Sequence, residues 1–327
     1  MSNSRLSTAI DQGALILPEG KIMVIRPESD YDISALPRDD VMISTGFYPD
    51  FIRWSDAGYV TLAKPEPADV AIVVLPKSKA LARSLIGQAA SWAKLVVVDG
   101  NKTEGIDSIF KDCRKALGDL PSITKAHGRI FWFEGTDKFT GWIAGEPQMS
   151  ATGFYTTAGV FSEGKIDKGS QLLLDALPEK LPSRVADMGA GWGYLSRAIL
   201  DRSGVKSLDM IEAEALSLDC ARLNIDDPRA NSHWADATGF APSAPYDAVI
   251  MNPPFHTGRA AQPQLGQAFI TAAARMLAPH GKLWMVANRH LPYEQALRDT
   301  FRNVTELAGN GGFKVFHATR PNKQKGR

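Results

Sequence analysis

The tetrapeptide Asn-Pro-Pro-Phe, formed by Asn252, Pro253, Pro254 and Phe255, could orient a planar nitrogen for attack on an electrophile. An amide or exocyclic base nitrogen is a poor nucleophile because its lone pair is delocalised. The side-chain oxygen of Asn252 and the backbone carbonyl of Pro253 could each accept one N–H bond, which would direct the nitrogen and stabilise its developing positive charge. Successive prolines fix the turn, and Phe255 offers a flat face for a planar substrate. We therefore interpret these four residues as catalytic.

A second motif, Asp-x-Gly-x-Gly, places Asp187, Gly189 and Gly191 in a turn between a predicted strand and a predicted helix. Glycine lets the backbone come close to a ligand and adopt a positive φ without a clash at Cβ. A glycine-rich strand–helix turn also fits enzymes that bind dinucleotides. A carboxylate here would repel a pyrophosphate, whereas it would attract the sulfonium and ammonium of S-adenosylmethionine. The motif therefore predicts S-adenosylmethionine as the cofactor.

Two further strand ends carry an acid that could bind this cofactor. Glu212 stands 21 residues after Gly191, where a carboxylate can accept both ribose hydroxyls, and Ala213 follows it. Asp236 could accept the adenine amino group while the amide of Ala237 faces the ring. Acids at strand ends are also common as solvated, capping or turn residues. We predict that these four residues bind the cofactor, together with Asn252, Asp187 and the two glycines.

The elements that must position these residues alternate between strand and helix from residue 181 onward. Short apolar runs end in turns rich in Gly, Asp or Asn, and amphipathic stretches follow them. Apolar strands bracketed by helices imply a mainly parallel sheet covered on both faces. We expect strands at 184–187, 207–212, 233–236, 247–251 and 282–287, helices at 194–201, 214–224 and 264–277, and a closing antiparallel pair at 303–307 and 313–317.

The N-terminal half repeats part of this order. Residues 68–76 (ADVAIVVLP) resemble 246–254 (YDAVIMNPP), and a predicted helix, strand and helix follow in each half. We infer a degenerate internal duplication, with chance similarity between two α/β domains as the alternative. No Gly-rich turn follows the first apolar strand at 21–25, and Leu-Pro-Lys-Ser at 75–78 replaces Asn-Pro-Pro-Phe. The first copy should therefore bind no cofactor and serve as a scaffold or for recognition.

These patterns predict two domains and a linker. Residues 1–130 form the degenerate domain, and residues 158–327 form the catalytic domain. Residues 131–157 between them are rich in Gly, Thr and aromatics without clear periodicity, and we expect them to be the linker.

Composition limits the class of protein. The net charge is +1, which argues against indiscriminate coating of nucleic acid, although no acidic residue follows Glu306 while Lys314, Arg320 and three further cations do. The two cysteines form no CxxC pair, so we expect no disulfide, no metal site and a cytoplasmic location. No apolar run reaches the roughly 18 residues of a membrane span. We also expect a monomer.

Four segments resemble a known family. Residues 159–174 (GVFSEGKIDKGSQLLL), 252–256 (NPPFH), 287–293 (ANRHLPY) and 312–315 (GFKV) are similar to the "methyltransferase small" family, and in particular to RsmC-like ribosomal RNA guanine-N2 methyltransferases. The resemblance implies a class I methyltransferase fold, Rossmann-like, with an antiparallel C-terminal strand and a preceding methyltransferase-like domain that binds no cofactor. It implies as target the exocyclic N2 of a guanosine in small-subunit (16S) ribosomal RNA, with this RNA or the small subunit as partner.

The Asn-Pro-Pro-aromatic motif by itself leaves the substrate open, because it suits several planar nitrogens. A protein glutamine N5-methyltransferase is the second hypothesis and an adenine-N6 nucleic-acid methyltransferase the third. A non-catalytic RNA-binding factor for ribosome assembly is a different class of answer, although the intact motifs argue against it. A nicotinamide-dependent oxidoreductase would fit the expected fold alone.

Overall fold

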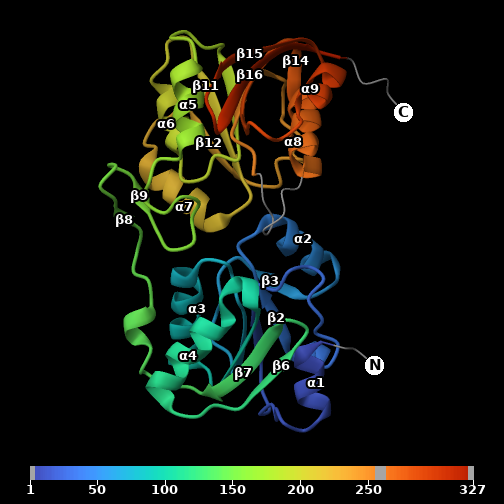
Figure 1. Ribbon diagram of the computed structural model, residues 1–327, viewed down its shortest axis with the longest axis vertical. Coiled ribbons are helices and arrows are strands. Elements are labelled where there is room, and N and C mark those ends of the chain that lie inside the picture. Colours follow the sequence, from blue (N-terminus) through green and yellow to red (C-terminus); the bar gives the residue numbers. More distant parts are fainter. Residues whose placement is uncertain (1–3, 255–262, 323–327) are drawn as a thin grey trace. The chain divides into compact units, whose positions relative to one another are not determined.

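The computed structural model describes residues 4–254 and 263–322 of the 327-residue chain. The chain divides into two compact units, each with its own large sheet (Figure 1). The N-terminal unit comprises Met1–Glu146 and Thr157–Gly159, and the C-terminal unit comprises Pro147–Thr156 and Val160–Arg327. None of the helices in the described part of the chain is long and apolar enough to cross a membrane.

The C-terminal unit is built on a seven-stranded sheet in the order β12-β11-β10-β13-β14-β16-β15. The first five strands in this order are parallel, and β16 is antiparallel to both of its neighbours. The central strands β10 and β13 are almost wholly buried, as their near-continuous apolar sequence predicts. The strands are β10 (Arg184–Met188), β11 (Ser207–Glu212), β12 (Ala230–Trp234), β13 (Tyr246–Met251), β14 (Leu277–Asn288), β15 (Phe301–Gly309) and β16 (Phe313–Pro321).

Helices cover both faces of this sheet, with α5, α6 and α7 on one face and α8 and α9 on the other (Figure 1). Because successive side chains of a strand point to opposite faces, Val185 shares a core cluster with Leu195 of α6, whereas the next residue, Ala186, shares one with Phe269 of α8. The helices are α5 (Lys168–Ala176), α6 (Tyr194–Leu200), α7 (Ala215–Asn224), α8 (Pro263–Met276) and α9 (Glu294–Thr300).

The N-terminal unit has the same architecture. Its sheet has the order β3-β2-β1-β4-β5-β7-β6, which is the order of the second sheet with the strands renumbered. This identity supports the inferred duplication, because the two units share one strand order. The elements are α1 (Arg5–Asp11), β1 (Ile22–Ile25), β2 (Val41–Ser44), α2 (Tyr48–Asp56), β3 (Val60–Leu62), β4 (Val70–Val74), α3 (Lys79–Trp92), β5 (Leu95–Asn101), α4 (Ile106–Leu117), β6 (Ser122–Lys125) and β7 (Gly128–Glu134), with short 3-10 turns η1 (Arg38–Asp40), η2 (Lys102–Glu104) and η3 (Thr140–Trp142).

The segment 131–157 differs from the expected linker. Its first residues complete β7, where Phe131 and Phe133 are buried and pair with β5. Phe139 is buried as well, with its ring centroid 5.5 Å from that of Phe133. The aromatics that suggested an irregular segment therefore belong to the core of the N-terminal unit. Within 147–156, the short pair β8 (Gln148–Met149) and β9 (Tyr155–Thr156) belongs to the C-terminal unit.

Two strands of the second sheet also differ from the predicted bounds. β12 begins and ends earlier than the predicted 233–236, because its sequence (ANSHW) is polar and half-exposed and lacks a clear apolar run. β14 begins at Leu277, before the predicted Lys282, across an irregularity in its pairing with β13. The remaining predicted strands and helices of this unit agree with the structure to within a few residues.

Candidate cofactor and substrate site

The predicted glycine-rich turn lies between β10 and α6 at the carboxyl ends of the parallel strands, where open α/β sheets bind ligands. Gly189, Gly191 and Gly193 have φ values of 77°, 57° and 91°, a region that residues with a Cβ rarely adopt. The N–H of Gly189 donates to the carbonyl of Ile211 at 2.8 Å, which holds the turn against β11. Gly193, which the sequence analysis did not single out, precedes the first residue of α6. The turn thus depends on glycine for its conformation.

Asp187 is fully buried beneath this turn. Its Oδ2 accepts a hydrogen bond from Ser196 Oγ at 2.6 Å, whereas its Oδ1 has no hydrogen-bond partner among the described residues. Burial raises the pKa of Asp187 to about 7, and the negative charge of Glu212 acts in the same direction, against the hydrogen bond from Ser196. A buried carboxylate oxygen without a partner is costly. The site therefore fits a cationic ligand such as S-adenosylmethionine, for which Asp187 would supply the opposite charge.

Glu212 links the end of β11 to the glycine-rich turn. Its carboxylate accepts the N–H of Gly191 at 2.8 Å through Oε2 and the N–H of Glu214 at 2.8 Å through Oε1. Burial raises the pKa of Glu212. Each carboxylate oxygen has a second lone pair, so both could still accept a ribose hydroxyl as the sequence predicts. In the structure itself, Glu212 organises the turn.

Asp236 and its neighbours form the third part of the predicted cofactor site. The carboxylate of Asp236 accepts hydrogen bonds from the backbone N–H and hydroxyl of Thr238, which closes the turn after β12. Ala237 is buried and packs in the core with α8, and the carbonyl of Ala213 accepts the indole N–H of Trp234 at 2.9 Å. The turn role of Asp236 is therefore present, and contact with adenine remains a prediction.

Asn252 follows β13 and is held in one orientation. Its Nδ2 donates to Asp167 Oδ1 at 2.9 Å and to Ser170 Oγ at 2.7 Å. Oδ1 of Asn252 is buried and has no hydrogen-bond partner among the described residues. Amide O and N atoms are assigned from their partners, and the carboxylate of Asp167 requires a donor on its side. Asn252 thus presents a spare acceptor, which is the atom that the predicted chemistry needs.

The other residues of the motif are placed only in part. Pro253 is buried and Pro254 is exposed. Phe255 lies outside the described residues, so its predicted stacking role stays a prediction.

Asp167 and Ser170 were not predicted as site residues. Asp167 is the N-cap of α5, where its side chain accepts the N–H of Ser170 at 2.8 Å. The pattern Asp-x-x-Ser before an apolar helix is a recognisable capping signal, but nothing in it shows the second contact with Asn252, 85 residues later in the chain. The helix cap and the substrate motif therefore share one carboxylate.

Within residues 4–254 and 263–322, no group of three or more His, Cys, Asp or Glu side chains could hold a metal ion.

Comparison with known proteins agrees with this geometry. The family model of the methyltransferase small domain matches residues 151–317. Ribosomal RNA small subunit methyltransferase C of Shewanella halifaxensis is 34% identical over 271 residues, which is 78% of each chain. The protein of the same name from Hahella chejuensis is 29% identical over 329 residues, covering 92% of this chain and 94% of its own.

One solved structure is similar over both units. It is the T. thermophilus 16S rRNA N2 G1207 methyltransferase (RsmC) in complex with AdoMet and guanosine, with a TM-score of 0.79 and 23% identity, covering 97% of this chain and 92% of that chain. This similarity confirms the predicted fold, with a Rossmann-like methyltransferase domain after a methyltransferase-like domain.

Proposed function

We infer the function from one premise, that this chain belongs to the ribosomal RNA small subunit methyltransferase C family and carries its methyltransferase small domain. It is an enzyme that uses S-adenosylmethionine to methylate a guanosine of small-subunit ribosomal RNA at the exocyclic N2. The observation that carries this conclusion for the chain's own residues is the fixed amide of Asn252, whose Oδ1 is buried and accepts no hydrogen bond from any residue that the structure describes.

The proposed mechanism assigns one task to each part of the site. The cofactor, when bound, supplies an electrophilic methyl group. Asp187, Gly189, Gly191 and Glu212 would hold it at the end of β10 and β11. Oδ1 of Asn252 and the carbonyl of Pro253 would accept the two N–H bonds of guanine N2, which aligns its lone pair and stabilises the charge that develops on nitrogen. The methylated nitrogen is acidic enough to lose its proton to water, so no strong base is needed.

We propose that the N-terminal unit binds no cofactor and contributes to recognition of the RNA. Arg26 and Pro27 follow its first strand, β1, where the second copy has the glycine-rich turn, and Leu75-Pro76 follows β4 where the second copy has Asn252-Pro253. Pro27 cannot take the positive φ of the glycine-rich turn that is predicted to bind the cofactor, and Leu75 has no side-chain amide to accept an N–H bond from a substrate. We also propose a monomer that acts without metal in the cytoplasm.

The test is methyl transfer from labelled S-adenosylmethionine to three substrates: small ribosomal subunits, naked ribosomal RNA and a ribosome-free protein extract. Nucleoside mass analysis of the labelled RNA should identify N2-methylguanosine. Label found only in protein would replace this proposal with glutamine methylation, because the same Asn252 geometry suits a carboxamide nitrogen. N6-methyladenosine in place of N2-methylguanosine would contradict the assigned target.

A further inference from the structure

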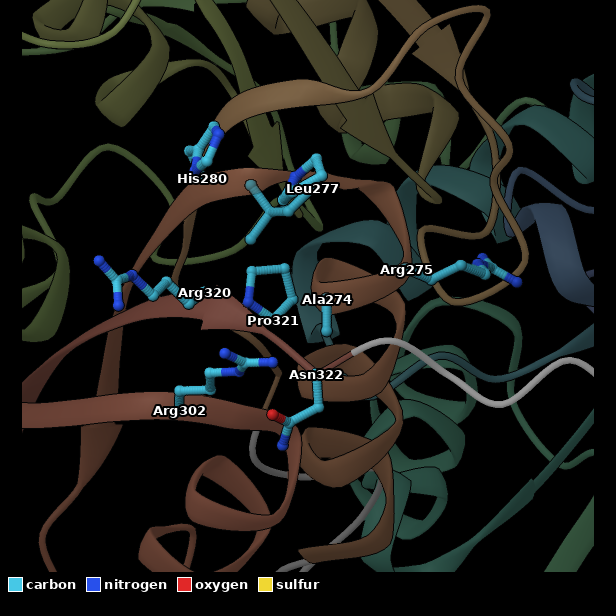
Figure 2. Close-up of a pocket in the computed structure, with 9 residues that line it drawn as sticks. Ala274, Arg275, Leu277, His280, Arg302, Arg320, Pro321 and Asn322 are labelled. Atoms are coloured by element: carbon cyan, nitrogen blue, oxygen red, sulfur yellow. The ribbon is translucent and has the colours of Figure 1, made fainter.

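A basic pocket opens in the C-terminal unit (Figure 2). Its volume of about 490 Å³ is that of a small-ligand pocket. The last turn of α8, the start of β14 and β15, and the end of β16 line it. Four of the nine lining residues are basic, namely Arg275, His280, Arg302 and Arg320, and none is acidic.

The register of the sheet separates this pocket from the candidate methyl-transfer site. Leu277, which lines the pocket, pairs with Tyr246 at the beginning of β13, whereas Asn252 follows Met251 at its end. The six residues of β13, at about 3.3 Å each, place the two sites about 20 Å apart. A ligand in the pocket therefore cannot contact the reacting nitrogen.

Two arginines of the pocket come from neighbouring strands, Arg302 from β15 and Arg320 from β16, and no acidic residue lines the pocket. β15 and β16 pair at Phe301–Pro321 and at Asn303–Thr319, on either side of these two arginines. Several positive charges gathered in one pocket repel one another. Both side chains are exposed, and neither makes a hydrogen bond or ion pair with another residue in 4–254 or 263–322. An anion bound in the pocket would offset this repulsion.

The backbone and the third arginine add to this arrangement. Arg320 has a φ of 59°, a strained conformation for a residue with a Cβ, of the kind that gathers at ligand sites. Arg275 is held in place, since its Nη2 donates to the carbonyls of Thr238 and Phe240 at 2.9 and 3.0 Å. The pocket thus combines one arginine held by backbone carbonyls, Arg275, with two exposed arginines, Arg302 and Arg320, whose side chains are available to a ligand.

We propose that this pocket binds a phosphodiester group of the substrate RNA, at a position several nucleotides from the methylated guanosine. Guanidinium groups bind phosphate oxygens in a bidentate manner, and the sequence beyond Asn322 adds three cations and no acid. The proposal rests on the proposed function. The pocket sets affinity for RNA and contributes nothing to the chemical step.

The test compares the full-length chain with Arg302→Gln/Arg320→Gln. The matched control is Lys206→Gln/Arg222→Gln, which removes two exposed positive charges of the same unit that do not line the pocket. Binding of small-subunit ribosomal RNA is measured at several salt concentrations between about 50 and about 200 mM. S-adenosylmethionine affinity and thermal unfolding verify that each variant is folded.

The pocket variant should bind RNA about tenfold more weakly at the higher salt, and its plot of log affinity against log salt should be less steep by about 0.7 to 0.9, the value for one lost phosphate contact. Its kcat at saturating RNA and its cofactor affinity should equal those of the wild type. Equal RNA affinity of the pocket and control variants would overturn the proposal.

A second arm separates RNA from a free phosphate ligand. Saturable binding of adenosine 5′-monophosphate that the pocket variant loses, with RNA binding unchanged, would assign the pocket to a small metabolite and overturn the proposal. A wild-type chain that binds RNA but never methylates it would refute the proposed function alone, because the salt dependence judges the pocket separately.

Discussion

Asn252 can act as an acceptor because its amide is prevented from turning over. A free asparagine presents its oxygen or its nitrogen to a substrate with similar ease. Here Asp167 and Ser170 receive both N–H groups, so an inverted amide would place its oxygen against a carboxylate. The preference for one orientation is therefore electrostatic, and it is set before any substrate binds.

The contact of Asp167 with the Asn252 amide predicts the effect of Asp167→Asn. Asparagine is as good an N-cap as aspartate, so α5 should keep its cap and the free energy of unfolding should change by less than about 0.5 kcal/mol. The new amide can donate to Asn252 as well as accept from it, which allows the inverted orientation. We expect kcat for RNA methylation to fall about tenfold or more, with S-adenosylmethionine affinity unchanged. Asp175→Asn, an exposed site on the same helix, is the control and should keep full activity.

Asp187 predicts a pH dependence of cofactor binding. Its pKa is raised to about 7, so the carboxyl group is largely neutral at pH 6 and loses its attraction for a cation. The apparent Kd for S-adenosylmethionine should decrease about tenfold for each unit by which the pH rises toward 7, and it should stay constant above pH 7. Isothermal titration calorimetry between about pH 5.5 and about pH 8.5 measures this Kd as a function of pH. A flat profile, or the same profile in Asp187→Asn, would contradict the role given to this carboxylate.

The sign for stability is opposite. A carboxyl group whose folded-state pKa exceeds its unfolded-state value stabilises the fold most when it is protonated. The contribution of Asp187 to the free energy of unfolding should therefore be complete below about pH 4 and decline as the pH rises toward 7. Without cofactor, the difference in stability between the wild type and Asp187→Asn should shift in favour of the variant over that range.

Among single residues, the sequence predicted those whose type is demanded by local chemistry. Asn252, Asp187 and the glycines could be identified because each stands at a strand end in a recognisable motif. Asp167 and Ser170 could not, because their role arises from a contact between segments more than 80 positions apart. Local patterns carry no information on such a pairing.

At the scale of elements, the turn between β10 and α6 requires glycine because its backbone adopts positive φ values. A Cβ on Gly191 would meet nothing within 4 Å, yet its φ is 57°. We expect Gly191→Ala to lower the free energy of unfolding by about 1 to 2 kcal/mol through backbone strain and to weaken S-adenosylmethionine binding. Gly141→Ala, where a Cβ also meets nothing and no positive φ is present, is the control for thermal unfolding. Equal stability of the two variants would show that the turn conformation is not needed.

Elements with a strong apolar period were predictable, and elements without one were not. β10 and β13 are nearly continuous apolar runs, which predict buried parallel strands. α8 repeats its apolar residues at helical spacing. β12 is half-exposed and polar, so its register on β11 decides its position. The end of β7 was predicted to be linker because Phe131 and Phe133 precede a glycine-rich stretch. β7 is buried along most of its length, so its sequence lacks the alternation of apolar and polar residues that marks a half-exposed strand.

At the scale of the whole molecule, the chain contains two copies of one sheet, and the sequence motifs predicted to bind the cofactor occur in the second copy alone. The repeat was predictable because 68–76 and 246–254 retain the same order of acidic residue, apolar strand and proline, and the shared strand order supports it. The boundary between the copies was less predictable, since short segments on either side of residue 157 pack with different units.

Isothermal titration of the full chain with S-adenosylmethionine or S-adenosylhomocysteine should give one site per chain. The N-terminal copy lacks the glycine-rich turn that a cofactor requires. Two equivalent sites would refute the assignment of the N-terminal unit as a domain without cofactor, and competition by nicotinamide dinucleotide would question the identity of the cofactor itself.

The most direct measurement of the central claim is single-turnover formation of N2-methylguanosine by Asn252→Ala, together with its Kd for S-adenosylmethionine. Loss of an acceptor that acts on the developing charge should reduce the rate by about two orders of magnitude or more, while the Kd stays within about threefold of the wild type. A rate close to that of the wild type would show that Oδ1 of Asn252 does not orient guanine N2. A fall in cofactor affinity as large as the fall in rate would show that Asn252 holds the cofactor, and would contradict the division of roles proposed here.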